Sequence, residues 1–196
     1  MAFYSKQELQ EIGFKSLGEN VKVSKLASIY GANKISIGDN SRIDDFCVLS
    51  AGEGGIEIGR YVHISVYVSI IGAGRVILED FTGLSSKCAV YSSNDDYSGE
   101  FMTNPCVPSD YTNVTNAPVT LKRHSLVGAG SIILPGVEIG ECAAVGSMSM
   151  VNKSLEGGHI YIGRPAQKLR KRSRKCEDLE KELAKNTVLS ANNKSN

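Results

Sequence analysis

Large aliphatic residues recur at every sixth position along most of this chain. In the C-terminal half they are Leu121, Val127, Ile133, Ile139, Val145 and Val151. The fifth position of each unit is mostly small, as at Ser125 and Ser131, and glycine often stands second. A period of six fits neither the 3.6-residue repeat of an amphipathic helix nor the two-residue repeat of a half-buried strand. It predicts a triangular coil with one short strand on each side and one large and one small side chain pointing inward.

The N-terminal half repeats this pattern in groups of three units. Their leading residues are Leu17, Val23 and Ile29; Ile37, Ile43 and Leu49; Ile58, Ile64 and Ile70; and Leu78, Leu84 and Val90. Two or three extra residues follow each group, as expected for a bulge at one corner of each turn. Together with the C-terminal units, the groups predict an all-β fold of about six stacked parallel coils over residues 17–156. Glycines and other small residues are expected to turn the corners.

Both ends of the chain are expected to be helical. Ser5 and Glu8 form a capping box and Gly13 is a stop signal, so residues 1–16 are predicted to form a helical cap. Residues 157–196 are predicted to be a C-terminal extension, with a basic helix over 167–185 and a mobile polar tail, "NTVLSANNKSN".

One long insertion interrupts the repeat at residues 92–119. It contains "SSNDDYSGEFMTNPCVPSDYTNV", which is polar and acidic but also holds aromatic residues and prolines. A loop of this length inside a compact domain is usually functional or disordered. Its aromatic residues and prolines favour an ordered, functional loop.

The segments on both sides of the insertion resemble a known family. "VGAGSIILPGVEIGECAAVGS" is similar to the left-handed parallel β-helix of the hexapeptide-repeat acyltransferases. "SSNDDYSGEFMTNP", "AAVGSMSMVNKSL" and "YIGRPAQKLRKR" resemble the galactoside-acetyltransferase-like branch, which includes acyltransferases of nucleotide-linked aminosugars. The resemblance implies a homotrimer in which the loop covers an acceptor cleft between subunits. It also implies that the arm of CoA lies along the later coils.

The acidic loop departs from the wider family, in which many members place a histidine there as the general base. This loop holds Asp95, Asp96 and Glu100 and no histidine. A carboxylate is a weak base for activating an alcohol. A neutral amine attacks a thioester without such help, and a carboxylate can accept the proton of the resulting intermediate. The loop therefore favours an amino-sugar acceptor and formation of an amide. Together with the resemblance, this implies transfer of an acyl group, with acetyl-CoA as the expected donor, to the amino group of a nucleotide-linked aminosugar of cell-surface polysaccharide synthesis.

The candidate site residues come from the loop and from outward positions of the coils. For catalysis we expect Asp96, Asp95, Ser86 and His63, and for acceptor binding Tyr97, Glu100, Asn104 and His124. The two aspartates also suit a turn, Ser86 could be a plain exposed serine, and the two histidines could serve as surface or subunit-contact residues. His159 is expected to pack near the last coil.

CoA recognition is expected from bare backbone and from basic side chains. The pantetheine amides can pair with exposed main-chain groups, and the 3′-phosphate requires cations. The expected contacts are Gly128, Ala129, Gly130, Gly146, Ser147, Lys153, Arg164 and Lys168. The glycines could equally serve the corners of the coil. The basic run "RPAQKLRKRSRK" could equally be a solvated helix face.

Composition limits the remaining classes. A net charge of +1 gives no reason to expect a nucleic-acid partner, and no segment predicts a signal peptide or a membrane span. Five cysteines without metal-type spacing predict reduced thiols, a cytoplasmic location and no metal or permanently bound cofactor. In "YVHISVYVSII" the outward positions, including Tyr61, Val66, Tyr67 and Ile71, are apolar enough to predict a subunit interface.

Three alternatives remain open. The first is O-acetylation of a sugar hydroxyl, with His63 or His124 as the base. The second is a zinc hydratase, which requires three histidines that converge on one metal. The third is a non-catalytic β-helix that acts as a binding module.

Overall fold

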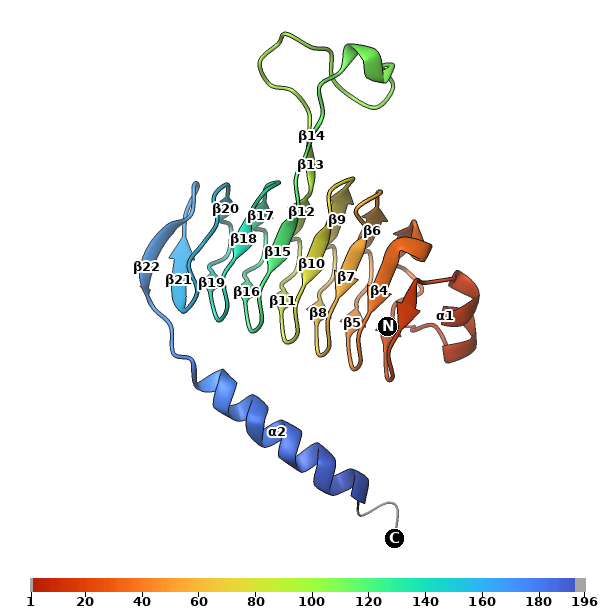
Figure 1. Ribbon diagram of the computed structural model, residues 1–196, viewed down its shortest axis with the longest axis vertical. Coiled ribbons are helices and arrows are strands. Elements are labelled where there is room, and N and C mark those ends of the chain that lie inside the picture. Colours follow the sequence, from red (N-terminus) through yellow and green to blue (C-terminus); the bar gives the residue numbers. More distant parts are fainter. Residues whose placement is uncertain (1, 193–196) are drawn as a thin grey trace.

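The chain winds into a parallel β-helix from which a long loop and a C-terminal helix project (Figure 1). The computed structural model describes the backbone of residues 2–192 and the side chains of residues 2–186. The first sheet contains β1 (Ser16–Leu17), β4 (Ile35–Ile37), β7 (Ile56–Ile58), β10 (Val76–Leu78), β15 (Val119–Leu121) and β18 (Glu138–Ile139). The second contains β2 (Lys22–Val23), β5 (Arg42–Ile43), β8 (His63–Ile64), β11 (Gly83–Leu84), β16 (Leu126–Val127), β19 (Ala144–Val145), β21 (His159–Ile162) and β22 (Gln167–Lys171). The third contains β3 (Ser28–Tyr30), β6 (Val48–Ala51), β9 (Ser69–Gly72), β12 (Ala89–Tyr91), β17 (Ile132–Ile133) and β20 (Met150–Val151).

Each coil contributes one strand to each of these sheets. We number the coils 1 (β1–β3), 2 (β4–β6), 3 (β7–β9), 4 (β10–β12), 5 (β15–β17) and 6 (β18–β20). A partial seventh coil follows, in which Leu155 pairs with Ile139 and β21 pairs with β19. The predicted parallel β-helix of about six coils is therefore confirmed, with this extra part-turn at its C-terminal end.

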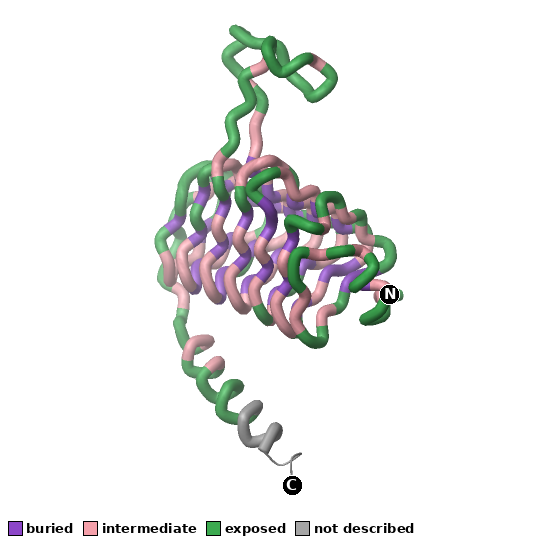
Figure 2. The backbone as a smooth tube through the Cα atoms, turned by 45° about the vertical axis from the view of Figure 1, so that its right-hand side comes forward, coloured by how far each residue is buried: buried purple, intermediate pink, exposed green. Residues whose placement is uncertain are grey.

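The six-residue period sets the register between coils. On the second sheet the leading residues Val23, Ile43, Ile64, Leu84, Val127 and Val145 pair with one another from coil to coil. All six are at most 2% exposed. Figure 2 shows the buried residues as regularly spaced segments along successive coils. The core is thus a stack of aliphatic layers, each of which is closed only by the coils above and below it.

Many corners of the coil are turned by residues other than glycine. Phe46 and Tyr67 have φ values of 61° and 60°, and Tyr61 and Phe81 have values of 57° and 60°. A left-handed backbone costs about 1–2 kcal/mol for an L-residue. The rings stack across coils with centroids 4.9 Å apart in each pair, which offsets part of that cost. The expectation that small residues would turn the corners is wrong at these positions, because the stacked rings occupy them.

The N-terminal end is capped as predicted. Helix α1 (Lys6–Ile12) begins at a capping box between Ser5 and Glu8 and ends at Gly13, whose φ is 77°. Leu9 of this helix is buried and packs against the hydrophobic core of the coils. A short 3₁₀ turn, η1 (Ala32–Lys34), lies at a corner of the first coils.

The C-terminal extension differs from the prediction. The basic helix expected over 167–185 begins later, because residues 167–171 form β22, which pairs antiparallel with β21. Without β22, the outer edge of β21 would leave backbone N–H and C=O groups unpaired, and residues 167–171 form hydrogen bonds with these groups. Helix α2 (Lys175–Asn192) follows, and residues 193–196 of the predicted tail lie outside the described residues. No helix within residues 2–192 is both long and apolar enough to cross a membrane.

The insertion leaves the β-helix after β12, which ends at Tyr91, and rejoins it at β15, whose first residue is Val119. A two-stranded hairpin of β13 (Ser93–Asn94) and β14 (Thr115–Asn116) lifts the loop away from the coils (Figure 1). The loop contains one 3₁₀ turn, η2 (Ser109–Tyr111). The chain then continues from coil 4 to coil 5 without loss of register, since Leu78 pairs with Leu121.

Truncation of one core layer tests the stacking. Leu121 is fully buried and its neighbour Thr120 points outward in the same strand. We expect Leu121→Ala to lower the unfolding free energy by about 2–5 kcal/mol. Thr120→Ala should change it by less than about 0.5 kcal/mol. Urea unfolding followed by circular dichroism measures both, and equal losses in the two variants would contradict the assigned inward face.

Candidate active site

A notch lies on the outer face of the second sheet, across coils 3 to 5. It has a volume of about 250 Å³ and is open to solvent. Strands β8, β11 and β16 supply His63, Gly83 and Leu126, and the corners that follow these strands supply Ser65, Ser86 and Ala129. The notch therefore brings together His63 and Ser86, two of the predicted catalytic residues.

A buried carboxylate holds the imidazole at the edge of this notch. His63 Nε2 lies 2.9 Å from Asp44 Oδ2, and Arg42 Nε lies 2.5 Å from Asp44 Oδ1. The Asp44 side chain is 4% exposed, whereas that of His63 is 54% exposed. Burial acts to raise the pKa of Asp44, but hydrogen bonds from His63 and Arg42 outweigh it and leave this pKa below the usual value. The ionised carboxylate accepts a hydrogen from Nε2, which leaves the lone pair of a neutral His63 on Nδ1.

Two serine hydroxyls form the other edge of the notch. Ser65 Oγ and Ser86 Oγ are 3.1 Å apart, in adjacent coils. The carbonyl of Ser86 accepts a hydrogen bond from the backbone N–H of Gly130 at 2.9 Å, which fixes the corner. The hydroxyls can both donate and accept, so they suit a substrate amine or hydroxyl group.

The loop carboxylates lie apart from this notch within one chain. Asp96 accepts hydrogen bonds from the backbone N–H and the hydroxyl of Ser98, at 2.9 and 2.6 Å, and from the Asn113 amide. These hydrogen bonds, that of the Ser98 hydroxyl above all, hold the pKa of Asp96 below its usual value. Asp95 is exposed beside it. The hairpin carries both residues away from the coils (Figure 1), so one chain alone does not join them to Ser86.

The predicted acceptor-binding residues of the loop are open to solvent. Tyr97 is 88% exposed, and Glu100 and Asn104 are also exposed. Asn104 accepts a hydrogen bond from the backbone N–H of Cys106 in a turn. These side chains have room for a ligand or for a second subunit.

The predicted glycine contacts for CoA lie at one corner of coils 5 and 6. Gly128, Ala129, Gly130 and Gly146 are half-buried and Ser147 is exposed. A side chain at Gly128 would come within 2.5 Å of the backbone nitrogen of Ser147, and Gly130 has a φ of 71°. The coil itself therefore requires these glycines, and the same requirement leaves a strip of bare backbone on the surface.

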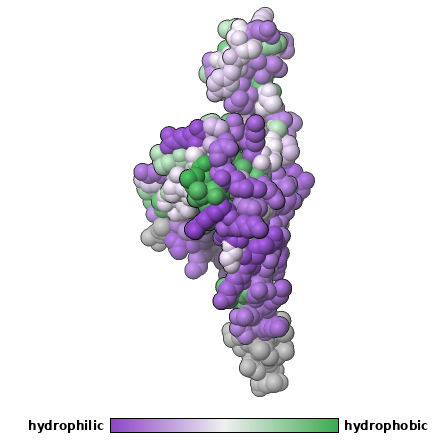
Figure 3. Space-filling model, turned by 90° about the vertical axis from the view of Figure 1, so that its left-hand side faces the viewer, coloured by the Kyte–Doolittle hydropathy of each residue, from purple (hydrophilic) through white to green (hydrophobic). Residues whose placement is uncertain are grey.

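Basic side chains gather near the last coil. Lys153, Arg164 and Lys168 are exposed. Arg164 Nε donates to the carbonyl of Met148 at 2.7 Å, and Lys168 Nζ pairs with Glu156 at 2.6 Å. Figure 3 shows this end of the molecule, where an apolar area is bordered by hydrophilic residues. Ile162 and Leu169 are the exposed large apolar residues of β21 and β22.

The two other histidines do not line the notch. His124 is 8% exposed, stacks on Phe81 and places Nε2 2.8 Å from Glu180 of α2. Its ring thus helps to hold the C-terminal helix against the coils. His159 Nδ1 lies 2.8 Å from the carbonyl of Gly157. The three histidines therefore have separate partners and do not converge on one point.

Sequence reasoning missed Asp44 and Gly83. Asp44 directly follows the core residue Ile43, and Gly83 directly precedes the core residue Leu84. Asp44 is buried beneath His63, whereas Gly83 lies in the outward row of the second sheet. Only the pairing of coils places them beside His63, about twenty residues away along the chain. One pattern in the sequence could have pointed to these two residues: polar or small residues recur at equivalent positions of the six-residue unit in coils 2, 3 and 4.

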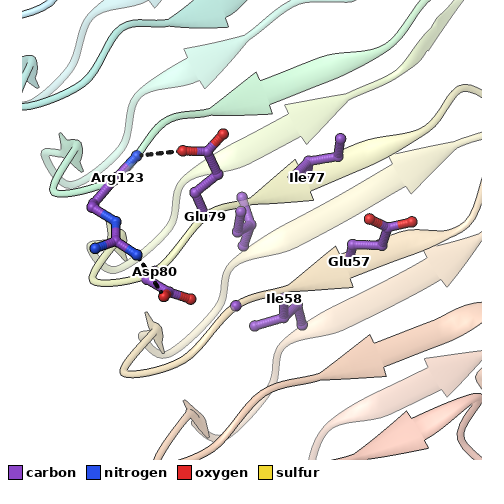
Figure 4. Close-up of a pocket in the computed structure, with 8 residues that line it drawn as sticks. Glu57, Ile58, Ile77, Glu79, Asp80 and Arg123 are labelled. Atoms are coloured by element: carbon purple, nitrogen blue, oxygen red, sulfur yellow. Dashed lines mark hydrogen bonds and ion pairs between the residues drawn. The ribbon is translucent and has the colours of Figure 1, made fainter.

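A second cavity lies on the first sheet and has different chemistry. Its volume is about 390 Å³, and Glu57, Glu79, Asp80 and Arg123 line it together with apolar residues (Figure 4). Arg123 already binds Asp80 at 2.9 Å, and its backbone N–H donates to Glu79 at 3.0 Å. Glu57 is paired with Arg75 at 2.8 Å, so each charged group named here already has a partner in a neighbouring coil. The cavity is therefore better explained as a surface stabilised by ion pairs than as a reaction site.

Comparison with known proteins gives consistent results. No protein-family model matches the sequence. The dTDP-4-amino-4,6-dideoxy-D-glucose acyltransferase of Escherichia coli is 51% identical over 180 residues, which cover 92% of this chain and 94% of that protein. A putative lipopolysaccharide biosynthesis O-acetyl transferase of Escherichia coli strain K12 is 27% identical and covers 78% of this chain and 76% of that protein.

Solved structures agree with the sequence relatives. AntD, an N-acyltransferase from Bacillus cereus, was solved in complex with dTDP and 3-hydroxybutyryl-CoA. It superposes with a TM-score of 0.90 at 46% identity and covers 96% of this chain and 100% of that chain. A serine variant of the same enzyme, in complex with dTDP-4-amino-4,6-dideoxyglucose and CoA, gives a TM-score of 0.91 at 47% identity over 94% of this chain and 98% of that chain. With half of its residues identical to an acyltransferase over nearly its whole length, this chain belongs to the hexapeptide-repeat acyltransferases of the nucleotide-aminosugar branch, which use CoA thioesters as acyl donors.

Proposed function

We propose that the protein transfers an acyl group from a CoA thioester to the amino group of a dTDP-linked aminosugar, with dTDP-4-amino-4,6-dideoxyglucose as the acceptor. The observation that carries this proposal is the likeness to the Bacillus cereus enzyme that was solved with this sugar nucleotide and CoA. The acidic loop without a histidine supports an amine over an alcohol, because an amine needs a weaker base.

The proposed reaction combines groups from two subunits. The notch of one subunit holds the acceptor beside Ser86 and His63, and the loop of a neighbouring subunit supplies Asp96. The neutral amine attacks the thioester carbonyl, and the C–N bond forms to give a tetrahedral intermediate. The N–H proton of this intermediate passes to Asp96, with Asp95 beside it; the intermediate then collapses, the C–S bond breaks and the CoA thiolate leaves. The solved neighbours include variants of AntD at one serine and one aspartate, the residue types that this assignment uses.

The CoA arm lies along the bare corner of coils 5 and 6 in this proposal. Gly128, Ala129, Gly130, Gly146 and Ser147 present main-chain groups to the pantetheine amides. The 3′-phosphate lies near Lys153, Arg164 and Lys168 at the last coil. Their exposure and positive charge support this placement.

The proposed assembly is a homotrimer. Leu26, Phe46 and Tyr67 are 53%, 48% and 54% exposed at the corner between the second and third sheets. Large apolar side chains in a row on an exposed surface indicate a protein contact. The distance of the loop from the notch within one chain supports the same conclusion, since a neighbour is needed to bring the two together (Figure 1).

O-acylation of a sugar hydroxyl is the second candidate. The observation that favours it is the pair of Asp44 and His63, because a histidine with a free Nδ1 is the base that an alcohol needs. For the physiological setting, we place the product in cell-surface polysaccharide synthesis. We place the reaction in the cytoplasm, where acyl-CoA and nucleotide sugars are both available.

The function is tested by assaying acetyl-CoA and 3-hydroxybutyryl-CoA with a panel of dTDP-aminosugars and simple sugars, with products identified by mass spectrometry. We expect N-acylated dTDP-aminosugar. Asp96→Asn should lower kcat/KM at least about 100-fold, because the proton acceptor is lost. Asp95→Asn is the matched control and should lower it less than about tenfold. An ester product, or activity that depends on His63 but not on Asp96, would favour the second candidate.

The contact between Asp44 and His63 predicts a pH-dependent contribution to stability. Asp44→Asn should lower the unfolding free energy by about 1–3 kcal/mol at neutral pH. Because the folded-state pKa of Asp44 lies below its unfolded value, this contribution is fully present above about pH 4. It is lost as the pH falls through the folded-state pKa. Urea unfolding of the wild type and of Asp44→Asn at about pH 7 and about pH 3 should show a difference in unfolding free energy that is smaller at the lower pH. A difference that is independent of pH would argue against the ionised contact.

Disruption of the apolar corner tests the trimer. Wild-type protein should show three times the mass of the 21.0 kDa chain in light scattering. Tyr67→Asp should reduce both the mass and the acylation rate, because a charge replaces a ring that the proposed trimer buries, and the site shared between subunits separates. Ser36→Asp places the same charge on the outward face of β4 and should leave both unchanged. A fully active Tyr67→Asp monomer would exclude a site shared between subunits.

A further inference from the structure

One position in the outward row of the second sheet has no side chain. In this row Arg42 pairs with His63, His63 with Gly83, and Gly83 with Leu126. The missing side chain at Gly83 exposes the backbone of β11 between an imidazole on one side and a leucine on the other. This exposed backbone forms the floor of the notch.

The backbone itself does not require glycine at this position. Gly83 lies in a strand and lacks the left-handed φ found at several corner glycines. A Cβ added there would meet a single atom within 4 Å, Leu126 Cδ1 at 3.2 Å, at the end of a flexible side chain. At Gly128, in contrast, a Cβ would meet the backbone nitrogen of Ser147 at 2.5 Å. Glycine weakens a strand and often marks the close approach of a ligand.

The walls of the notch differ in polarity. Leu126 is 42% exposed and offers an apolar surface on the side of coil 5. The hydroxyls of Ser65 and Ser86 and the imidazole of His63 offer hydrogen-bonding groups on the other side. The ring of a deoxy-aminosugar has the matching arrangement, with apolar C–H faces and an edge of hydroxyl and amine groups. The extended pantetheine arm of CoA has no such compact amphipathic shape.

The size of the notch also suits part of a ligand. Its volume of about 250 Å³ is below the range of about 300–1,000 Å³ that is usual for a complete ligand pocket. A sugar ring without its nucleotide requires only a fraction of such a pocket. The neighbouring subunit and its loop would then enclose the rest of the acceptor.

We propose that the notch over Gly83 is the subsite for the aminosugar ring, and that Gly83 and Leu126 together determine which acceptors fit. The apolar face of the ring packs on Leu126, and the amine points toward Ser86, where the thioester arrives from the corner at Ala129. This inference rests on the proposed N-acylation and adds the place and the size limit of the acceptor.

The test fills the notch from its floor. Gly83→Ala and Gly83→Val are compared with Ser36→Val. This control places a valine at an outward strand position away from the notch. KM for dTDP-4-amino-4,6-dideoxyglucose should rise about threefold in the alanine variant and at least tenfold in the valine variant, because the ring is displaced from its floor. KM for the acyl-CoA should change less than about twofold. The Ser36→Val control should match the wild type in both constants.

A second variant makes the test specific. Leu126→Ala in the Gly83→Val background restores space in the notch and should recover part of the acceptor affinity, but not all of it, because the apolar wall on which the ring packs is lost. Thermal midpoints near that of the wild type show that the variants are folded, and the alanine variant, which meets only a movable atom, keeps the test valid if valine prevents folding. An unchanged acceptor KM, or an equal rise in KM for the acyl-CoA, would overturn the subsite. A wild-type enzyme that acylates no dTDP-aminosugar would instead refute the proposed function.

Discussion

The hydrogen-bonded ladder between successive coils is the interaction on which the rest of the structure depends. Most strands contain only two to four residues, so none could persist alone. Each is held by parallel neighbours in the coils above and below, and the same step from coil to coil stacks the aliphatic residues into one core. A slip in register would expose that core, and the leading positions of the repeat are accordingly all Leu, Ile or Val. The rigid exterior that results is the scaffold for the chemistry.

The ladder also explains how residues that are distant in the sequence come together in one site. Residues about twenty positions apart meet at fixed spacing on an outer face, as Asp44 and His63 do, and as Ser65 and Ser86 do. The corners require small residues where coils approach closely, so the strip near Gly128 and Ser147 exposes main chain. A surface with regular side-chain rows and bare backbone can bind an extended thioester on one side and a compact sugar on the other.

The inserted loop interrupts the coil without disturbing it. A short antiparallel hairpin isolates the loop from the ladder, so that coil 5 pairs with coil 4 as if the insertion were absent. The sequence of the loop is therefore free of the six-residue period that the coils impose. Helix α2 is attached in a different way, through Glu180 to His124 and Arg123, and this contact occupies a histidine that would otherwise be available for chemistry.

The sequence by itself determined the parallel β-helix, the capped N-terminus, the presence of a long loop after the fourth coil and the acyltransferase family. These features depend on local periodicity, on capping residues and on motifs that are contiguous in the chain. Tertiary structure alone decided that residues 167–171 form a strand, that stacked aromatic residues turn several corners, and that His124 faces α2. It also decided that Asp44 and Gly83 flank His63, and that the β13–β14 hairpin lifts the loop that contains Asp96 away from the coils. The physical reason is that these outcomes depend on which coils and segments meet across the ladder, and no periodic pattern in the sequence records the partner of an outward side chain.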